Sequence, residues 1–314
     1  PVLPGGPPGY GGRWPEWPET VHEVAADELS RREFDVVLFQ TRANWLEDQW
    51  QLLSERQRQL PRIYLEHDPP REHPTDTRHP VDDPAVLLIH VTHFNALMWD
   101  SRRSPTRVIE HGVTVPAGVR YTGELERGIA VVNNIVPRGR RLGADVFARV
   151  RDEADVPLDL IGMGADELGG LGEVRLAELP AFVARYRFFF NPIRYTSLGL
   201  AVCEAMLVGL PICGLATTEM VRVIEDGVSG YLDTNVEALV PRMRQLLADP
   251  ELARHLGDGA RRTARERFGI DRFARDWLVA LEDVSNGRVA TTRDTNPAAT
   301  RRSNEEATAT RRSA

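Results

Sequence analysis

The sequence predicts an α/β protein made of two units, each built around a parallel sheet. Short apolar segments typical of strands alternate with amphipathic segments typical of helices, which favours parallel strands joined by helical crossovers. A stretch rich in Pro, Gly and polar residues, at about 113–127, separates a first series of such segments from a second. With 314 residues, the chain is long enough for two domains of ordinary size.

The first unit is predicted to hold four strands. They are the apolar segments 34–39, 62–66, 85–91 and 107–110. An amphipathic segment covers 21–32, helices are predicted at 45–59 and 94–100, and residues 67–83 form a polar loop. Residues 1–20 are rich in Gly, Pro and Trp and are predicted to be loop.

The second unit is predicted to begin with a strand at 128–133. Further strands are expected at 158–161 and 188–190, and helices at 144–153, 179–185, 200–208, 236–248 and 250–284. The tail has almost no apolar periodicity and is predicted to be disordered. These patterns divide the chain into a first domain (1–115), a second domain (116–284) and a disordered tail (285–314).

Composition excludes several classes of protein. The net charge of −7 argues against general nucleic-acid binding. No apolar run approaches the roughly 20 residues of a transmembrane helix, and no signal peptide is visible. Cys203 and Cys213 lie in apolar segments, which suits small core residues in a reducing compartment; a catalytic thiol is the alternative. We therefore expect a cytoplasmic protein, with peripheral membrane contact left open.

The chain contains no lysine, so all 39 of its basic residues are arginine. Any cationic side chain that contacts a phosphate must then be a guanidinium group. Such a group is planar and donates in a bidentate fashion, unlike the point charge of lysine.

The run from Asn191 to Asp233 carries the strongest functional signal. It is predicted to form a loop, an apolar helix, a strand, a second loop and a short helix, with Gly where the backbone must bend. A helix start behind Ser197, Leu198 and Gly199 would offer unpaired N–H groups and a positive dipole end to a phosphate. Glu204, about one turn into the helix, is placed to accept hydrogen bonds from sugar hydroxyls. Together they predict a nucleotide-sugar site.

This run resembles the donor-binding signature of family 4 glycosyltransferases, which are retaining enzymes with the two-domain GT-B fold. The family pattern is a Glu, seven residues, a second Glu with Ala-Met, a Gly-x-Pro step, and a later Glu ahead of a Gly-rich turn. The positions that match are Glu204, Ala205, Met206, Gly209, Pro211, Glu219 and Gly227 to Gly230. The first Glu of the pattern falls on Thr196.

The resemblance implies a GT-B arrangement of two Rossmann-like domains that face each other across a cleft. The first domain would hold the acceptor and the second domain the nucleotide-sugar donor, and the last helix, 270–284, would cross back to the first domain. Family members open with a short strand and a Gly-rich turn, whereas this chain opens with a loop. We therefore expect a truncated first domain, with a naturally reduced one as the alternative.

The resemblance also implies the site residues. In the Arg-rich loop, Arg138 matches a family Lys that holds the donor diphosphate and balances charge on the leaving group, and Arg141 is the reserve. A solvated basic loop is the alternative. The residues implied for catalysis are His67, Arg138 and Glu204. Those implied for donor binding are Asn134, Arg141, Gly162, Gly164, Thr196, Ser197, Leu198, Gly199, Leu200, Glu204, Thr218 and Glu219.

Some of these positions have alternatives in ordinary structural roles. His67 ends a strand where the family often places a His beside the reacting sugar. Thr218 replaces a family Gly and would look much the same as a helix cap. His90 and His93 either line the cleft or are buried and hydrogen-bonded. The His- and Asp-bearing loop 66–79 does not fit a helical zinc motif, so no metal is predicted.

The function predicted is transfer of a hexose from a UDP- or GDP-sugar to a hydroxyl acceptor, with retention and without metal or other cofactor. The acceptor would be a glycan, a lipid-linked sugar or a small molecule. Thr196 carries no charge where the family has Glu, which favours a slower enzyme or a different donor. The alternative is a non-catalytic nucleotide-sugar-binding relative or partner subunit; a sugar epimerase ranks last.

Overall fold

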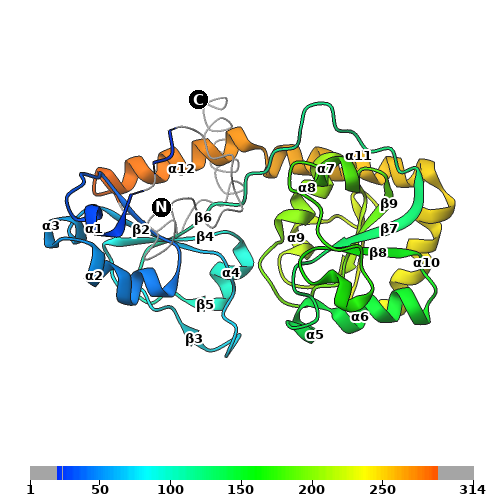
Figure 1. The fold of residues 1–314 in the computed structure, drawn as a ribbon, viewed down its shortest axis with the longest axis horizontal. Coiled ribbons are helices and arrows are strands. Elements are labelled where there is room, and N and C mark those ends of the chain that lie inside the picture. The colour runs from blue at the N-terminus through cyan, green and yellow to red at the C-terminus, as the bar shows by residue number, and fades with distance from the viewer. Residues whose placement is uncertain (1–19, 23, 289–314) are drawn as a thin grey trace, which may run out of the picture.

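The computed structural model describes residues 20–22 and 24–288, and they form two lobes side by side along the long axis (Figure 1). Each lobe holds its own parallel sheet. The loop predicted at 1–20 lies outside the described part of the chain except for its last residue. The predicted disordered tail lies outside it from residue 289 onward.

The first lobe contains a four-stranded sheet in the order β1-β2-β4-β6, with every neighbouring pair parallel. Its strands are β1 (Val37–Phe39), β2 (Arg62–Glu66), β4 (Val86–His90) and β6 (Thr106–Val108). The helices are α1 (Ala26–Leu29), the π-helical turn η2 (Asn44–Asp48), α2 (Gln49–Leu52), α3 (Glu55–Arg58) and α4 (His93–Met98). A separate pair of short strands joins β3 (Thr77–Arg78) to β5 (Trp99–Asp100).

The second lobe contains a five-stranded parallel sheet in the order β11-β10-β9-β7-β8. Its strands are β7 (Leu125–Val131), β8 (Leu158–Ile161), β9 (Tyr186–Asn191), β10 (Ile212–Leu215) and β11 (Gly230–Asp233). The first helices are α5 (Gly139–Leu142), α6 (Ala144–Ala148), η3 (Arg149–Glu153), η4 (Ala165–Leu168) and α7 (Leu179–Val183). The later ones are α8 (Leu200–Val208), α9 (Met220–Val223), α10 (Val236–Ala248), α11 (Pro250–Arg267) and α12 (Ile270–Ser285).

Both faces of the second sheet are buried, which explains the unbroken apolar run in β9. Phe189 packs in one core cluster, whereas Phe188 and Phe190 pack in the other. Because successive side chains of a strand point to opposite faces, a strand covered on both sides must be apolar at every position. The predicted parallel α/β class is confirmed.

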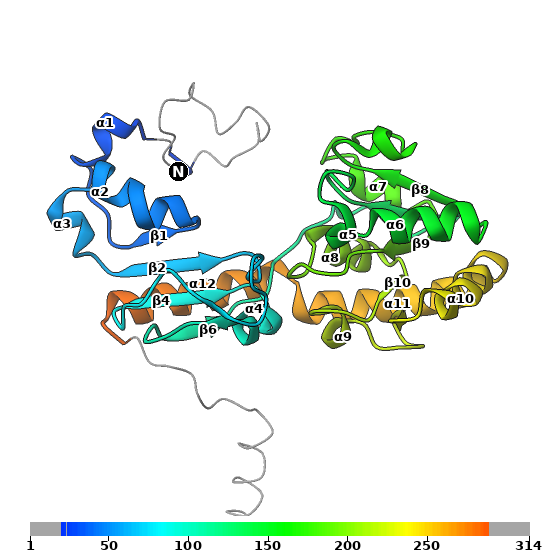
Figure 2. The ribbon, with the colours of Figure 1, turned by 90° about the horizontal axis from the view of Figure 1, so that it is seen from below.

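The last helix crosses back to the first lobe, as predicted. Ala280 and Val284 of α12 pack against Ile63, Leu87 and Ile89, which lie on one face of the first sheet. Figures 1 and 2 show α12 running along that sheet and α11 along the second lobe.

The single predicted helix 250–284 is wrong, because the chain forms two helices there. α11 ends at Arg267, and Gly269 has an extended backbone that stops the helix before α12 begins. Val113 N donates to Phe268 O at 2.9 Å, so two chain segments meet where the helices join.

Other boundaries also differ from the prediction. The helix predicted at 45–59 is broken, because Ser54 starts a new helix through a capping box with Gln57. The helix predicted at 94–100 ends at Met98, and the next two residues form β5. The first strand of the second lobe begins at Leu125 rather than 128, which shortens the connection between lobes. The division at 115/116 stays a prediction.

No helix within the described ranges is both long and apolar enough to cross a membrane.

Candidate functional site

The order of the second sheet points to one place for a ligand. Counted along the chain, its strands are arranged 2-1-3-4-5, with β7 first and β9 third. In open α/β sheets of this order, the crossover helices change face between the first and third strands, and a crevice opens at their carboxyl ends. The loops that leave these two ends are 132–138 and 192–199. They contain five of the twelve predicted donor-binding residues: Asn134, Thr196, Ser197, Leu198 and Gly199.

The helix after the second of these loops begins as predicted. α8 covers Leu200–Val208, and Gly199 is its N-cap with extended backbone and no side-chain cap. The first N–H groups of α8 are therefore not satisfied by a capping side chain, which suits an anion. A Cβ placed on Gly199 would meet no atom within 4 Å, so the space in front of the helix start is open.

Glu204 is half-buried and faces a small, mostly apolar pocket. The pocket is lined by Val131, Leu179, Pro180, Val183, Phe189, Ala201 and Ala205. Burial raises the pKa of the Glu204 carboxyl to about 7. Within the described residues this carboxylate has no hydrogen-bond or ion-pair partner, although desolvation makes such a group costly. A pair of ligand hydroxyls would satisfy it.

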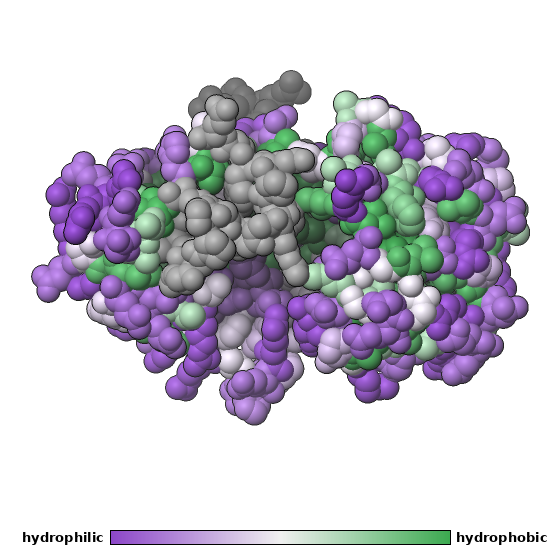
Figure 3. Space-filling view, in the orientation of Figure 1, coloured by the Kyte–Doolittle hydropathy of each residue, from purple (hydrophilic) through white to green (hydrophobic). Residues whose placement is uncertain are grey.

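Apolar side chains surround this region. Figure 3 shows them gathered around α7 and α8, on the part of the second lobe that faces the first. Leu200 of α8 and Leu176, just before α7, are both exposed. An apolar wall beside a few directed polar groups is typical of small-molecule sites.

The Arg-rich loop (133–141) and the turn at 162–164 are brought together. Asn134 N donates to Met163 O at 2.6 Å, and Met163 N donates to the Asn133 side chain at 2.9 Å. Gly162 has a φ of +132°, and a Cβ there would lie 2.6 Å from Val132 O, so only glycine fits. Gly164, with a φ of +68°, then starts η4.

Arg138 and Arg141 lie at the start and on the body of α5. Arg138 is exposed, and Arg141 is half-buried. Burial, followed by the charges of Arg71 and Arg138, lowers the pKa of the Arg141 guanidinium. In the described part of the chain neither side chain forms an ion pair, whereas the neighbouring Arg140 pairs with Asp145 at 2.7 Å. Two unpaired guanidinium groups thus remain available for a ligand.

The segment 217–219 is attached to the donor loop and to the first lobe. Thr218 Oγ donates to Ser197 O at 3.5 Å. Thr218 has a φ of +52°, which is unusual for a β-branched residue and costs about 1–2 kcal/mol. Thr196 is half-buried in the same loop, while Ser197 and Leu198 are buried.

Glu219, predicted to contact the donor, is placed at the contact between the lobes. Its side chain is completely buried, and one carboxylate oxygen accepts from Phe94 N at 2.8 Å. The other oxygen lies 3.2 Å from Arg222 Nε and 3.8 Å from Arg267. This carboxylate is already engaged, unlike that of Glu204.

His67 lies in the loop after β2 and is exposed, with Nε2 3.1 Å from Gln40 Oε1. Further along the same loop, Pro70 O accepts from Tyr195 Oη at 2.8 Å. The Tyr195 ring also packs edge-on against Phe94, with centroids 5.7 Å apart. These contacts show that the carboxyl end of β2 faces the second lobe, which is where His67 must lie to meet a donor sugar.

His90 follows the structural alternative of a buried, hydrogen-bonded side chain, whereas His93 does not. His90 is completely buried, and burial, followed by the charge of His79, lowers its pKa to about 3. His79 is also buried, and its Nε2 lies 3.1 Å from Glu66 Oε2. His93 is exposed at the start of α4. Across the described residues, no group of three or more His, Cys, Asp or Glu side chains is arranged to hold a metal ion.

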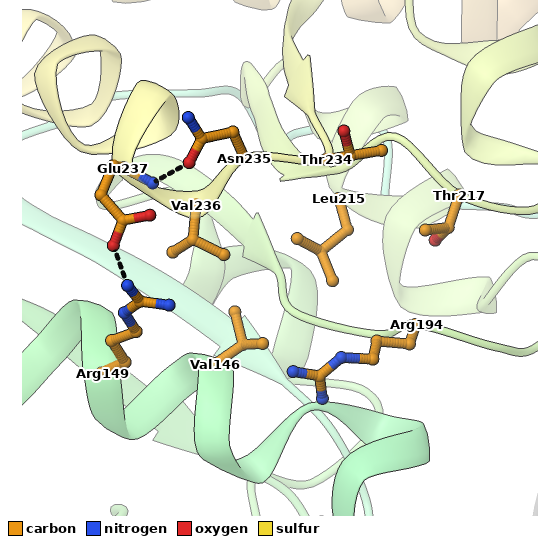
Figure 4. A pocket seen from close by; sticks show the side chains of 9 residues that line it. All are labelled: Val146, Arg149, Arg194, Leu215, Thr217, Thr234, Asn235, Val236 and Glu237. Atoms are coloured by element: carbon orange, nitrogen blue, oxygen red, sulfur yellow. Dashed lines mark hydrogen bonds and ion pairs between the residues drawn. The ribbon is translucent and has the colours of Figure 1, made fainter.

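A second cavity lies at the carboxyl ends of β10 and β11 and was not predicted (Figure 4). Its volume is about 370 Å³, and its lining is Val146, Arg149, Arg194, Leu215, Thr217, Thr234, Asn235, Val236 and Glu237. Its two arginines are already paired, Arg149 with Glu237 and Arg194 with Asp145. Arg194 comes from the loop 192–199, so this cavity adjoins the crevice, but among the described residues its arginines are already paired.

Comparison with known proteins finds a family match in the second lobe. Residues 126–249 match the family model for glycosyl transferases group 1. The matched segment begins in β7, ends after α10 and contains the crevice, the Arg-rich loop and Glu204. The second lobe is therefore similar to the corresponding part of these glycosyltransferases.

Curated relatives match part of the chain. The N-acetyl-alpha-D-glucosaminyl L-malate synthase of Bacillus anthracis is 33% identical over 101 residues, which are 30% of this chain and 26% of the relative. The sucrose synthase of Denitrovibrio acetiphilus is 29% identical over 178 residues, or 51% of this chain and 22% of the relative. The chain thus matches only about a quarter of the length of these relatives.

Solved structures show the fold. Sucrose-phosphate synthase from Thermosynechococcus elongatus superposes with a TM-score of 0.60 at 17% identity, over 80% of this chain and 74% of that chain. Anabaena HepE in complex with UDP and glucose gives 0.60 at 16% identity, over 79% and 78%. With its two facing sheets and crossing helix, the chain has the GT-B fold.

Proposed function

We propose that this chain binds a nucleotide-diphosphate sugar in the β7–β9 crevice and transfers the hexose to a hydroxyl acceptor. The observation that carries this proposal is the carboxylate of Glu204, which has no partner among the described residues and lies half-buried one turn into α8 behind an uncapped helix start. The carboxylate would accept hydrogen bonds from donor hydroxyls, and the helix start would take phosphate oxygens. Structural neighbours crystallised with UDP and glucose or GlcNAc support this assignment.

In this mechanism Arg138 and Arg141 neutralise the diphosphate as it leaves. Charge develops on the leaving phosphate in the transition state, so guanidinium groups positioned there stabilise it more than the ground state. His67 would contact the transferred sugar or the acceptor from the first lobe. We propose that the reaction retains the anomeric configuration and needs no metal ion. Thr196 carries no charge where the family has Glu, so the departing diphosphate would supply the negative charge beside the reacting sugar.

The test is incubation with isotope-labelled UDP- and GDP-hexoses, with EDTA present and absent. We expect transfer to an added acceptor, or slow hydrolysis, unchanged by EDTA, and NMR of the product should show the donor's anomeric configuration. No binding and no turnover of any nucleotide sugar would overturn the proposal, and an inverted product would overturn retention alone.

A second candidate is a nucleotide-sugar-binding protein without turnover, which Thr196 favours because it removes a charge from the sugar side of the site. Thr196→Glu distinguishes the two. If wild type is inactive and Thr196→Glu gains turnover, the chain is a nucleotide-sugar-binding protein without turnover. Turnover by the wild type itself would exclude it.

A further inference from the structure

The loop after β2 is held by both lobes. Trp99 Nε1, from the first lobe, donates to Asp68 O at 2.8 Å. Tyr195 Oη, from the second lobe, donates to Pro70 O at 2.8 Å. The backbone that carries the next residue, Arg71, is therefore fixed against the second lobe although it belongs to the first.

The same tyrosine is attached to the Arg-rich loop. Arg141 O accepts from Tyr195 N at 3.2 Å and from Arg194 N at 3.0 Å. Arg71 thus follows one partner of the Pro70–Tyr195 contact, and Arg141 is bonded to the other. Their electrostatic interaction agrees with this placement, because Arg71 lowers the pKa of Arg141 and Asp68 raises it.

Positive charge is in excess where the lobes meet. Arg71 is half-exposed and pairs with Asp68 at 2.5 Å. Arg138 and Arg141 form no ion pair in the described part of the chain. Asp68 pairs with Arg71 and is also an electrostatic neighbour of Arg141, so one carboxylate faces guanidinium groups of both lobes. The charges of Arg71 and Arg138 act unfavourably on Arg141, and a bound anion would relieve the repulsion.

We propose that Arg71 is a phosphate ligand contributed by the first lobe, which completes with Arg138 and Arg141 a diphosphate site shared between the lobes. This inference rests on the proposed function for the identity of the anion. The phosphate competes with Asp68 for Arg71, and its planar guanidinium can bind two phosphate oxygens at once. A diphosphate bound in this way also holds the lobes together.

Isothermal titration calorimetry with UDP and with inorganic pyrophosphate tests the proposal on the full chain. Arg71→Ala should weaken both by about tenfold, the effect of losing one charge-assisted contact. Arg78→Ala is the matched control, since it removes the same charge from the same connection between β2 and β4. Arg78 lies in β3, is exposed, and is 3.7 Å from Asp100. Its affinities should stay within about twofold of wild type.

Asp68→Asn gives a test of opposite sign. It removes the carboxylate that competes for Arg71 and should strengthen pyrophosphate binding by about threefold at low salt. The double variant Asp68→Asn/Arg71→Ala should lose this gain, because the gain acts through Arg71.

The outcomes separate this inference from the proposed function. If Arg71→Ala binds both ligands like wild type while Arg141→Ala does not, the second lobe alone holds the diphosphate and the inference is wrong. If wild type binds pyrophosphate in an Arg71-dependent way but no nucleotide sugar, the anion site stands and the proposed function fails. Binding of neither ligand by wild type would overturn both.

Discussion

Glu204 and Glu219 belong to one signature run, yet their surroundings are opposite. Glu204 faces a small apolar pocket without any partner in the described residues, and burial raises its pKa to about 7. Glu219 is completely buried but accepts from Phe94 N and lies beside Arg222 and Arg267. A buried carboxylate with partners stabilises the fold, whereas one without partners costs stability and is available to a ligand. We therefore infer that Glu219 stabilises the contact between the lobes and that Glu204 is available to bind a ligand.

The largest effect should come from Glu219→Ala. The substitution leaves Phe94 N without its acceptor and removes a buried charge from between two arginines, so we expect a loss of about 3 kcal/mol in the free energy of unfolding. Urea denaturation measures it. Glu225→Ala, an exposed carboxylate on the same segment, is the control and should change stability by less than about 0.5 kcal/mol. If the two variants were equally stable, Glu219 would have no structural role.

Glu204→Gln should change stability in the opposite direction. Burial raises the folded-state pKa of Glu204 to about 7, above its ordinary value of 4.5, so the wild type loses stability as the pH rises from about 4.5 through 7. The Gln variant escapes this loss and should be more stable by on the order of 2 kcal/mol at pH 8. At pH 4 the two should unfold alike. A difference that does not depend on pH would contradict the assigned environment.

A smaller effect separates two adjacent threonines. Thr218→Gly removes the strain of a left-handed β-branched residue, which offsets the entropic cost of glycine, so stability should change by less than about 1 kcal/mol. Thr217→Gly has no such strain to relieve and should destabilise by about 1 kcal/mol more. Thermal melts of the two variants give the difference, and the reverse order would show that Thr218 is not strained.

The smallest effect on stability is expected at Gly199. Alanine there meets no atom within 4 Å and the backbone is extended, so the free energy of unfolding should change by less than about 0.5 kcal/mol. The added methyl group stands in front of the α8 N-terminus, where the phosphate is proposed to bind. Donor affinity should therefore fall while the melting temperature stays the same. If the donor affinity were unchanged, the phosphate would not bind at the N-terminus of α8.

Sequence reasoning succeeded where the signals are local. α8 was predicted to the residue because Gly199 and Gly209 bound an apolar run, and Gly209 has a φ of +107° that stops the helix. The break in the predicted helix 45–59 was missed, although Ser54 and Gln57 form the S-x-x-Q pattern of a capping box.

It failed where partners are distant in the chain. Phe94 lies 125 residues from Glu219, and Pro70 lies 125 residues from Tyr195. Periodicity and motif spacing contain no information on such contacts, because they depend on how the two lobes dock. Arg71 was missed for the same reason, being one charge in a polar loop until the loop is placed against Arg141.

The most direct test of the account is calorimetric titration of UDP and GDP into wild type and Glu204→Gln at pH 8, where the wild-type carboxylate is ionised. We expect wild type to bind one of the two nucleotides. We expect Glu204→Gln to bind it at least about tenfold more weakly, although the variant is the more stable protein. Equal affinities for the two proteins would contradict the assignment of Glu204 to the donor.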